Sequence, residues 1–504
     1  GGRQSSDGRG LREGTPALSR QRHQSPVSAA PRLVYATTPA AAGTPRLLLA
    51  SWHFPPGDAT GALRWQRLAP FIAERGWSLD VLTADPSELP RRDDSRLAEL
   101  PAGVRIFGVT QPRLLRDRVE KKALALKRRL RTPVAGAELP APSRAAGRAP
   151  ATPDSFARTE VGWIPRRPRD LLRAWFAAGD YARYGAWATA VVEAGIAIAR
   201  DQPPSIVISC GPPHMAHDAG RRIAERLGCP YVMDLRDQWR LWERLPEALA
   251  HPLWWGLAAR YESKAVARAS LVVTNTDRAR LTMQQQYPAQ ADRIITVLNG
   301  YDDEPLPPAT SDGVFRIAYA GNIYLDRDPR PLFRAVAGLI ARTPADARVE
   351  VAFMGEVRSF DGRTLESIAA DEGIASHIRL YPPRVRHEAL RFLATAPVLI
   401  SLPQDSVMAI PSKLFEYIRF PAWVVTLAEP ASASALFSSD IGADLVWPGD
   451  VDALTALLVH HFHEFQSHGR PEPLARDTRF SRREQARRLL DRLAPLLAGR
   501  RVAA

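Results

Sequence analysis

The chain has 504 residues, more than one hydrophobic core usually organises, so two domains are expected. No run approaches the roughly 18 apolar residues needed to cross a bilayer, and no apolar stretch follows the N-terminal charges, so we expect no secretory signal. The chain has two cysteines, Cys210 and Cys229, which exclude a disulfide framework and fit a reducing compartment. A cytoplasmic location is therefore expected.

The formal net charge of +14 suggests anionic partners. However, only five of the 68 basic residues are lysines, so arginine is favoured along the whole chain. Such a general bias is more typical of genome composition than of a nucleic-acid surface, and we expect no specific nucleic-acid partner. One segment is different: residues 111–131 carry nine basic residues against Asp117 and Glu120.

The N-terminal part of the chain predicts a disordered tail followed by an α/β domain. Residues 1–45 are rich in Gly, Ser, Arg, Pro and Ala without periodicity, which is typical of disorder. From residue 46 a strand, a loop, a helix at 62–75 and a second strand follow one another, as in the βαβ unit of a doubly wound sheet. Further strands are expected at 205–209, 230–234, 270–274 and 294–298.

Residues 111–163 interrupt this alternation and are interpreted as an insertion. A turn signal at Asn299-Gly300 and the prolines after it mark the linker between the domains. A second α/β series then begins at 316. We expect an N-terminal domain over 46–304 and a C-terminal domain over 305–504 that includes the terminal helices. Two such halves are typical of two facing Rossmann-like domains.

In the first half, the loop from Gly57 to Arg64 follows a strand and precedes a helix. Glycines such as Gly57 and Gly61 let backbone N–H groups approach an anion or a sugar closely. The alternative is an ordinary turn.

Two more loops are expected at the same edge of the sheet. His214 follows one strand and could transfer protons or contact a sugar or phosphate, or could be a structural hydrogen-bonding residue. Asp234 and Asp237 flank Arg236 after another strand. These charges either form an ion-pair cluster or face a polar cleft, and the sequence does not decide which carboxylate faces it.

In the second half, Gly321 and Asn322 follow the first strand, and Arg327 and Arg330 lie beside the next helix. Arginines at a helix N-terminus are suited to a diphosphate. Given the bias toward arginine, they could also be ordinary surface residues.

The segment 410–417 is the most informative about function. It follows a buried strand at 397–402, and Pro411 suits the start of a new helix. A loop that leaves the carboxyl end of a parallel strand and enters a helix is where α/β proteins bind phosphates. Lys413 could meet phosphate charge, and Glu416 could accept hydrogen bonds from ribose hydroxyls. An ordinary helix start is the alternative. No ligand set at zinc spacing is present in the sequence, so no metal is expected.

Taken in order, these motifs resemble the retaining glycosyltransferases of family 4, which have the GT-B fold, and especially the bacterial branch that builds surface polysaccharides. The matching motifs are Phe54-Pro55-Pro56, Gly61-Ala62-Leu63-Arg64, Gly211-Pro212-Pro213-His214, Asp234-Leu235-Arg236-Asp237-Gln238-Trp239, Thr274-Asn275-Thr276, Asn299-Gly300-Tyr301-Asp302, Tyr319-Ala320-Gly321-Asn322 and Pro411-Ser412-Lys413-Leu414-Phe415-Glu416-Tyr417.

The resemblance implies a metal-independent hexosyltransferase that uses no cofactor. Its C-terminal domain would bind a nucleotide-diphosphate sugar, with Arg327 and Lys413 on the diphosphate and Glu416 on the ribose. The first glutamate of the family's Glu-x7-Glu pattern corresponds to Met408, so the contact to the sugar hydroxyls is in question. On the acceptor side, the glycine loop, His214 and the two aspartates would line the cleft.

The resemblance also gives the basic segment an interpretation. Apolar residues in 111–131 recur at helical spacing with basic residues around them. Such a helix could bind an anionic membrane surface, where polyprenyl-linked acceptors reside, or could pack on its own domain. The acceptor would be a saccharide or a polyprenyl-linked saccharide. Two alternatives to the transferase remain: an epimerase-like nucleotide-sugar enzyme, and a non-catalytic protein that binds membrane or nucleic acid.

Overall fold

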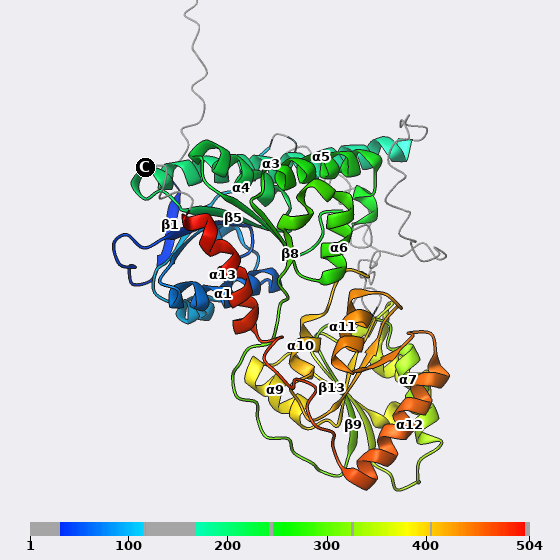
Figure 1. The fold of residues 1–504 in the computed structure, drawn as a ribbon. Coiled ribbons are helices and arrows are strands. Elements are labelled where there is room, and N and C mark those ends of the chain that lie inside the picture. Colours follow the sequence, from blue (N-terminus) through cyan, green and yellow to red (C-terminus); the bar gives the residue numbers. More distant parts are fainter. Residues whose placement is uncertain are drawn as a thin grey trace, which may run out of the picture.

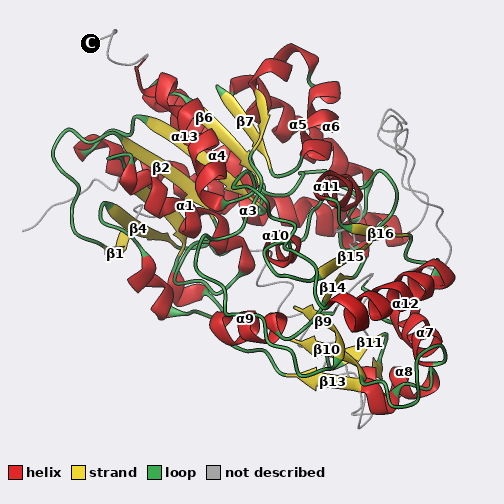
Figure 2. Ribbon diagram, turned by 60° about the horizontal axis from the view of Figure 1, so that its bottom comes forward, coloured by secondary structure: helices red, strands yellow, loops and turns green. Residues whose placement is uncertain are grey.

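A computed structural model describes residues 31–114, 116, 168–240, 245–323, 327–403 and 406–498. These residues form two α/β domains, one above the other in Figure 1. Each domain is built around its own sheet, and Figure 2 shows α10 and α11 in the region between the two sheets. The predicted fold class is confirmed at this level: two Rossmann-like domains face each other.

The N-terminal sheet has eight strands in the order β1-β4-β3-β2-β5-β6-β7-β8. β1 pairs antiparallel with β4, and the other pairings in this sheet are parallel. The strands are β1 (Arg32–Ala36), β2 (Arg46–Ser51), β3 (Ser78–Ala84), β4 (Val104–Val109), β5 (Ile206–Gly211), β6 (Tyr231–Leu235), β7 (Leu271–Thr274) and β8 (Ile294–Thr296).

Helices cover both faces of this sheet because its strands are apolar on both sides. Leu48 faces a core shared with α3, α4 and α5, whereas Leu47 and Leu49 face a core shared with α1 and α13 (Figure 1). The helices of this domain are α1 (Leu63–Glu74), α3 (Pro168–Asp201), α4 (Met215–Leu227), α5 (Pro252–Arg268), α6 (Asp277–Gln286) and α13 (Arg482–Ala498).

The C-terminal sheet has six parallel strands in the order β13-β10-β9-β14-β15-β16. One face packs on α7, α8 and α12, and the other on α9, α10 and α11. The elements are β9 (Phe315–Ala320), α7 (Arg330–Ile340), β10 (Val349–Met354), β11 (Ser359–Phe360), β12 (Arg363–Thr364), α8 (Leu365–Asp371), β13 (Ile378–Tyr381), α9 (Arg386–Ala394), β14 (Val398–Ser401), α10 (Ser412–Tyr417), β15 (Trp423–Leu427), α11 (Ala433–Ile441), β16 (Asp444–Val446) and α12 (Val451–His468).

The expected domain boundaries need two corrections. The prediction of disorder over 1–45 is wrong for its last part, because β1 is an edge strand whose Val34 and Tyr35 pack on the core; residues 1–30 lie outside the described residues. The assignment of the terminal helices to 305–504 is wrong for α13. This helix returns to the first domain, where Leu489 and Leu493 are buried against α1 and the sheet.

The chain therefore crosses between the domains twice. The outgoing segment at Tyr301 and the returning segment at Ser481 lie side by side in a short bridge. Arg482 ties the two crossings together, because its guanidinium donates to Asp302 Oδ1 at 2.6 Å and to the carbonyl of Asn299 at 2.6 Å.

Candidate functional site

The carboxyl ends of the two sheets face each other. Thr276, directly after β7, donates from Oγ1 to the carbonyl of Met408 in the loop after β14, at 2.8 Å. Thr282 Oγ1 on α6 lies 3.7 Å from Met408 Sδ. Met408, in the C-terminal domain, therefore contacts the N-terminal domain through both its carbonyl and its side chain. In parallel α/β sheets the carboxyl edge is where ligands bind, so the space between these edges is the candidate site.

Lys413 stands at this edge in the first turn of α10. Its Nζ lies 3.4 Å from the centroid of the Tyr319 ring, an arrangement in which the ring face attracts a cation. The atom is buried and makes no hydrogen bond within the described residues. Burial and, second, the charge of Arg327 lower the pKa of Lys413 well below its ordinary value. A helix beginning at Pro411 was predicted; α10 begins one residue later, at Ser412, with Pro411 as its N-cap, and has only six residues. The charge of Lys413 therefore matters more than the helix dipole.

Two glycines make room for this lysine. Gly321 has φ +130°, and a Cβ there would lie 2.7 Å from Lys413 Nζ. Gly355 has φ +143°, and a Cβ there would lie 2.4 Å from the Gly321 carbonyl oxygen. Because both positions combine a positive φ with close approach, a side chain at either would displace the strand ends from Lys413.

The loop after β9 is held by its polar residues. Asn322 Oδ1 accepts from the backbone N–H of Glu356 at 3.2 Å, and its carbonyl accepts from Arg327 at 2.8 Å. Arg327 is thereby anchored beside Lys413. Arg330, in contrast, pairs with Asp328 at 2.7 Å, so its guanidinium is already neutralised.

Glu416 lies on the same short helix. Its Oε1 accepts from Arg386 at 2.9 Å, while its buried Oε2 makes no hydrogen bond within the described part of the chain. Burial raises the pKa of Glu416, and Arg386 opposes that shift. Arg386 also donates to Glu304 at 2.7 Å, so Glu416 belongs to a charge network with one acceptor oxygen left over.

At the edge of the first sheet, Arg64 and Asp234 form a buried ion pair. Arg64 Nε lies 2.9 Å from Asp234 Oδ2, and a second nitrogen lies 2.9 Å from Oδ1. The remaining donors of Arg64 go to Asn299 Oδ1 and the carbonyl of Val297, and Trp65 Nε1 donates to Asp234 at 2.8 Å. Both side chains are almost completely buried and hydrogen-bonded to protein groups.

This geometry corrects two expectations. Arg64 belongs to the loop that was predicted to line the acceptor or phosphate site, but its donors are used by Asp234, the Asn299 side chain and the Val297 carbonyl. Asp234 was a candidate for the cleft, yet its side chain is 1% exposed, whereas that of Asp237 is 23% exposed. Of the two carboxylates, Asp237 is therefore the one near solvent.

The glycine loop is a structural turn. The N–H of Gly57 donates to the carbonyl of Phe54, and the carbonyl of Gly57 accepts from the guanidinium of Arg96. A Cβ at Gly61 would lie 1.9 Å from the guanidinium of Arg236, so Gly61 makes room for an arginine. Arg236 donates to the Pro212 carbonyl at 3.2 Å and was not among the predicted site residues.

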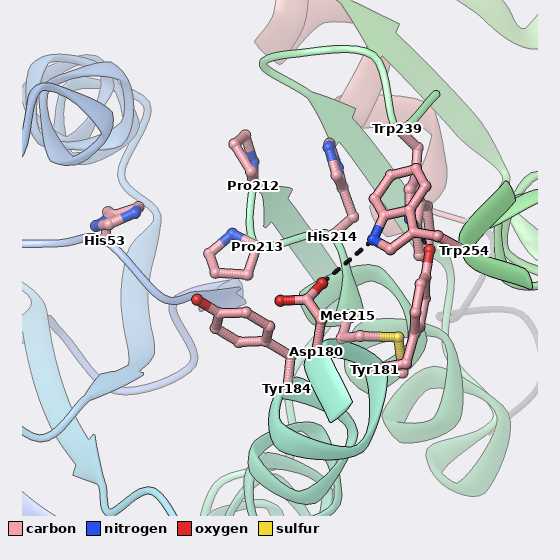
Figure 3. A pocket seen from close by; sticks show the side chains of 10 residues that line it. All are labelled: His53, Asp180, Tyr181, Tyr184, Pro212, Pro213, His214, Met215, Trp239 and Trp254. Carbon is pink, nitrogen blue, oxygen red and sulfur yellow. Dashed lines mark hydrogen bonds between the residues drawn. The ribbon is translucent and has the colours of Figure 1, made fainter. Parts of the chain in front are cut away.

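A pocket of about 320 Å³ is lined by Pro212, whose carbonyl accepts from Arg236. Figure 3 shows the side chains that line this pocket. His214 lines this pocket, with its ring stacked on Trp239 at 5.3 Å between centroids. Burial, then His217 and Arg236, lower the pKa of His214 well below its ordinary value, so the ring is neutral at pH 7. Burial and Arg236 lower the pKa of His53 to about 4. The sequence reasoning missed His53 and the lining residues from α3 and α5, because these segments are distant from His214 in the chain.

In the described part of the chain, no group of three or more His, Cys, Asp or Glu side chains is placed to hold a metal ion. None of the helices described there is long and apolar enough to cross a membrane. The predicted basic segment, 111–131, lies outside the described residues except for 111–114 and Arg116.

Two domains with facing carboxyl edges define the GT-B fold, and solved structures agree. Anabaena HepE in complex with UDP-glucose superposes with a TM-score of 0.54 at 12% identity, covering 89% of this chain and 99% of that one. The lipopolysaccharide outer core galactosyltransferase WaaB, in its apo form, gives 0.51 at 11% identity, covering 89% and 99%. At these identities the likeness establishes the fold alone.

No protein-family model matches the chain. The D-inositol 3-phosphate glycosyltransferase of Stackebrandtia nassauensis is 29% identical over 141 residues, 25% of this chain and 32% of that protein. D-inositol 3-phosphate glycosyltransferase 1 of Catenulispora acidiphila is 30% identical over 157 residues, 28% and 37% of the two chains. The chain thus spans about a third of the length of these curated relatives.

The buried ion pair gives a stability prediction. Arg64→Ala leaves Asp234 without a counter-charge in the core, and we expect it to lower the free energy of unfolding by about 3–5 kcal/mol. As a control, Glu74→Ala breaks an exposed pair with Arg483 and should cost less than about 1 kcal/mol. Urea unfolding followed by circular dichroism measures both. Equal midpoints for the two variants would contradict the structural role of Arg64.

Proposed function

We propose that this protein is a glycosyltransferase that moves a sugar from a nucleotide-diphosphate sugar to a saccharide or lipid-linked acceptor. One observation carries the proposal: Lys413 is held buried, without a hydrogen-bond partner among the described residues, at a carboxyl edge of the second domain that faces the first domain. A buried ammonium without a counter-charge is costly, and a diphosphate in the cleft would supply that charge. The names of the curated relatives and the fold support the same activity.

The donor would lie on the C-terminal domain. Lys413 and Arg327 would bind the diphosphate beside Gly321 and Asn322. Oε2 of Glu416, which lies 3.8 Å from Arg419 but accepts no hydrogen bond from the described residues, would accept one from a ribose hydroxyl. HepE was crystallised with UDP-glucose, so a UDP-hexose is the first donor to test.

The proposed mechanism of sugar transfer depends on where negative charge develops in the transition state. As the glycosidic bond to the donor breaks, negative charge grows on the departing diphosphate, and a preorganised cation stabilises it most strongly in a water-poor site. Lys413 and Arg327 supply that charge, so we propose a metal-independent transfer. We further propose retention of configuration, with the leaving phosphate deprotonating the acceptor hydroxyl on the same face of the sugar. His214 and Asp237 would line the acceptor side.

We propose that the protein works in cell-surface polysaccharide biosynthesis, in the cytoplasm at the inner face of the membrane. The support is a patch of exposed apolar side chains at the start of α3: Leu171, Leu172 and Trp175 are each at least 50% exposed. This patch follows the basic segment 111–131 in the chain, and apolar and basic groups together favour an anionic membrane surface.

Donor binding tests the proposed function. The best of a panel of UDP-, GDP-, ADP- and TDP-sugars is first found by thermal shift, because a ligand of the native state raises the melting temperature. We expect Lys413→Ala to weaken that donor about tenfold to a hundredfold, the range for a lost charge-assisted hydrogen bond. Glu416→Ala should weaken it less. Isothermal titration calorimetry measures both affinities.

Lys264→Ala is the matched control, because Lys264 is an exposed lysine on α5. The donor affinity of this variant should equal that of the unmodified protein. Product analysis with the best donor then separates transfer from epimerisation. An unchanged donor affinity in both Lys413→Ala and Glu416→Ala would refute the proposed donor site.

The lowered pKa of Lys413 predicts a pH dependence of donor binding. Above the lowered pKa the free lysine is neutral, and a bound diphosphate raises the pKa again, so binding takes up a proton. Donor affinity should therefore fall as pH rises, by up to about tenfold per pH unit, in the window between the two pKa values. Calorimetry at one pH in buffers of different ionisation enthalpy measures the uptake. Uptake that persists unchanged in Lys413→Ala would show that another group is responsible.

A further inference from the structure

A cluster of charged side chains lies where the chain crosses between the domains, with Asp302 of the outgoing segment at its centre. Asp302 Oδ1 accepts from Arg482 of the returning segment at 2.6 Å, and Oδ2 lies 3.4 Å from Arg67 on α1. Oδ2 also lies 3.4 Å from Arg386, the first residue of α9. One carboxylate therefore meets arginines from both domains.

The guanidinium of Arg386 is divided among three carboxylates. Its Nε donates to Glu304 Oε1 at 2.7 Å, and its Nη2 donates to Glu416 Oε1 at 2.9 Å. The same Nη2 lies 2.5 Å from Glu304 Oε1 and 3.4 Å from Asp302 Oδ2. Because this nitrogen carries only two hydrogens, it cannot bond fully to all three carboxylates at once. A stronger contact with Asp302 therefore weakens the contact with Glu416.

Arg386 is the main counter-charge of Glu416 in the part of the chain that the structure describes. Burial raises the pKa of Glu416, and Arg386 opposes that shift. Asp302 adds to the shift, and Arg419 opposes it more weakly than Arg386 does. Arg419 lies 3.8 Å from Glu416 Oε2, and another of its nitrogens donates to the carbonyl of Glu304. The charge of Glu416 therefore depends chiefly on Arg386.

The ionised form of Glu416 matters for the donor. In the proposed function Oε2 accepts a hydrogen bond from a ribose hydroxyl, and a carboxylate forms such a bond about twice as strongly as a neutral carboxyl group. A protonated Glu416 would bind the ribose more weakly. Arg386 can thus control the strength of donor binding through Glu416, without touching the donor.

We propose that Arg386 is a positioning residue for the donor: it holds the Glu416 carboxylate charged and in place for the ribose, while Asp302 competes for the same guanidinium. Because Asp302 lies at the crossing between the domains, this joint sets how strongly the second domain binds the ribose. The assignment of the ribose to Glu416 rests on the proposed function, whereas the competition between Glu416 and Asp302 for Arg386 does not.

The test measures the affinity of UDP-glucose, or of the best donor of the nucleotide-sugar panel, by calorimetry on the full chain at a series of pH values. Affinity should rise with pH through the pKa of Glu416, because a donor that binds the carboxylate releases the proton of the protonated form. The fall expected from Lys413 at higher pH is common to the variants below. The position of the rising limb therefore reports on Glu416.

Two substitutions should move that limb in opposite directions. Arg386→Met removes the counter-charge, so we expect the limb at higher pH and a donor affinity at pH 7 that is lower by about tenfold, the effect of losing one charge-assisted hydrogen bond. Asp302→Asn removes the competing carboxylate, so we expect the limb at lower pH. Arg386→Lys keeps the charge and should return the limb toward its original position. Damage to the fold would not shift the ionisation of Glu416 in two directions.

Matched controls are available on the same elements. Arg391→Met changes an exposed arginine of α9, and Asp303→Asn changes the exposed neighbour of Asp302, so both should leave the limb in place. Glu416→Gln should abolish the limb, and adding Arg386→Met to it should not restore one. Carboxyl-carbon NMR of glutamate-labelled protein without donor follows the same ionisation, with the Glu416 signal assigned by its loss in Glu416→Gln.

Opposite shifts in the two variants support the role of Arg386. A limb that stays in place in either Arg386→Met or Asp302→Asn, that moves the same way in both, or that persists in Glu416→Gln would overturn it. A protein whose Glu416 titrates with these opposite shifts in the NMR experiment but that binds no nucleotide sugar would refute the glycosyltransferase proposal and leave the coupling of Arg386 to Glu416 intact.

Discussion

The ion pair between Arg64 and Asp234 is the interaction on which the carboxyl edge of the first sheet depends. It joins the start of α1 to the end of β6, and Arg64 also holds Val297 and Asn299, where the chain leaves the domain. Removing either partner would leave an unpaired charge in the core. The pair therefore fixes the loop after β6, and with it Arg236, which donates to Pro212 in the wall of the pocket.

The two facing edges differ in how their charges are compensated. In the first domain the buried charges are paired, and the histidines near Arg236 are neutral because burial and that arginine disfavour their protonation. In the second domain, Lys413 rests on the Tyr319 ring, and its ammonium has no hydrogen-bond partner among the residues that the structure describes. This asymmetry explains why we assign the anionic part of a donor to the second domain.

The sequence predicted the fold well because its signals were local. Apolar strands, the glycines after them and the turn at Asn299-Gly300 each act within a few residues, so the two α/β series could be derived. The return of α13 could not, because an amphipathic helix does not specify which of two domains it covers. β1 was missed for a related reason: five residues at a sheet edge are too few to show a period within a polar tail.

The candidate site was only partly predictable. The position of Lys413 after a buried strand was correct, but its contact with the Tyr319 ring and its close approach to Gly321 depend on packing that the sequence does not show. Sequence reasoning could not decide between Asp234 and Asp237, because the answer is set by Arg64, 170 residues away along the chain. The pocket lined by His214 left no local signal, since its walls come from segments that meet only in the folded domain.

A structure of the protein with UDP-glucose, or with the best donor of the nucleotide-sugar panel, tests the central claim most directly. We expect the diphosphate to lie between the two carboxyl edges, with one oxygen about 3 Å from Lys413 Nζ and Arg327 beside it. A nucleotide bound outside this cleft, or one whose diphosphate does not contact Lys413, would contradict it.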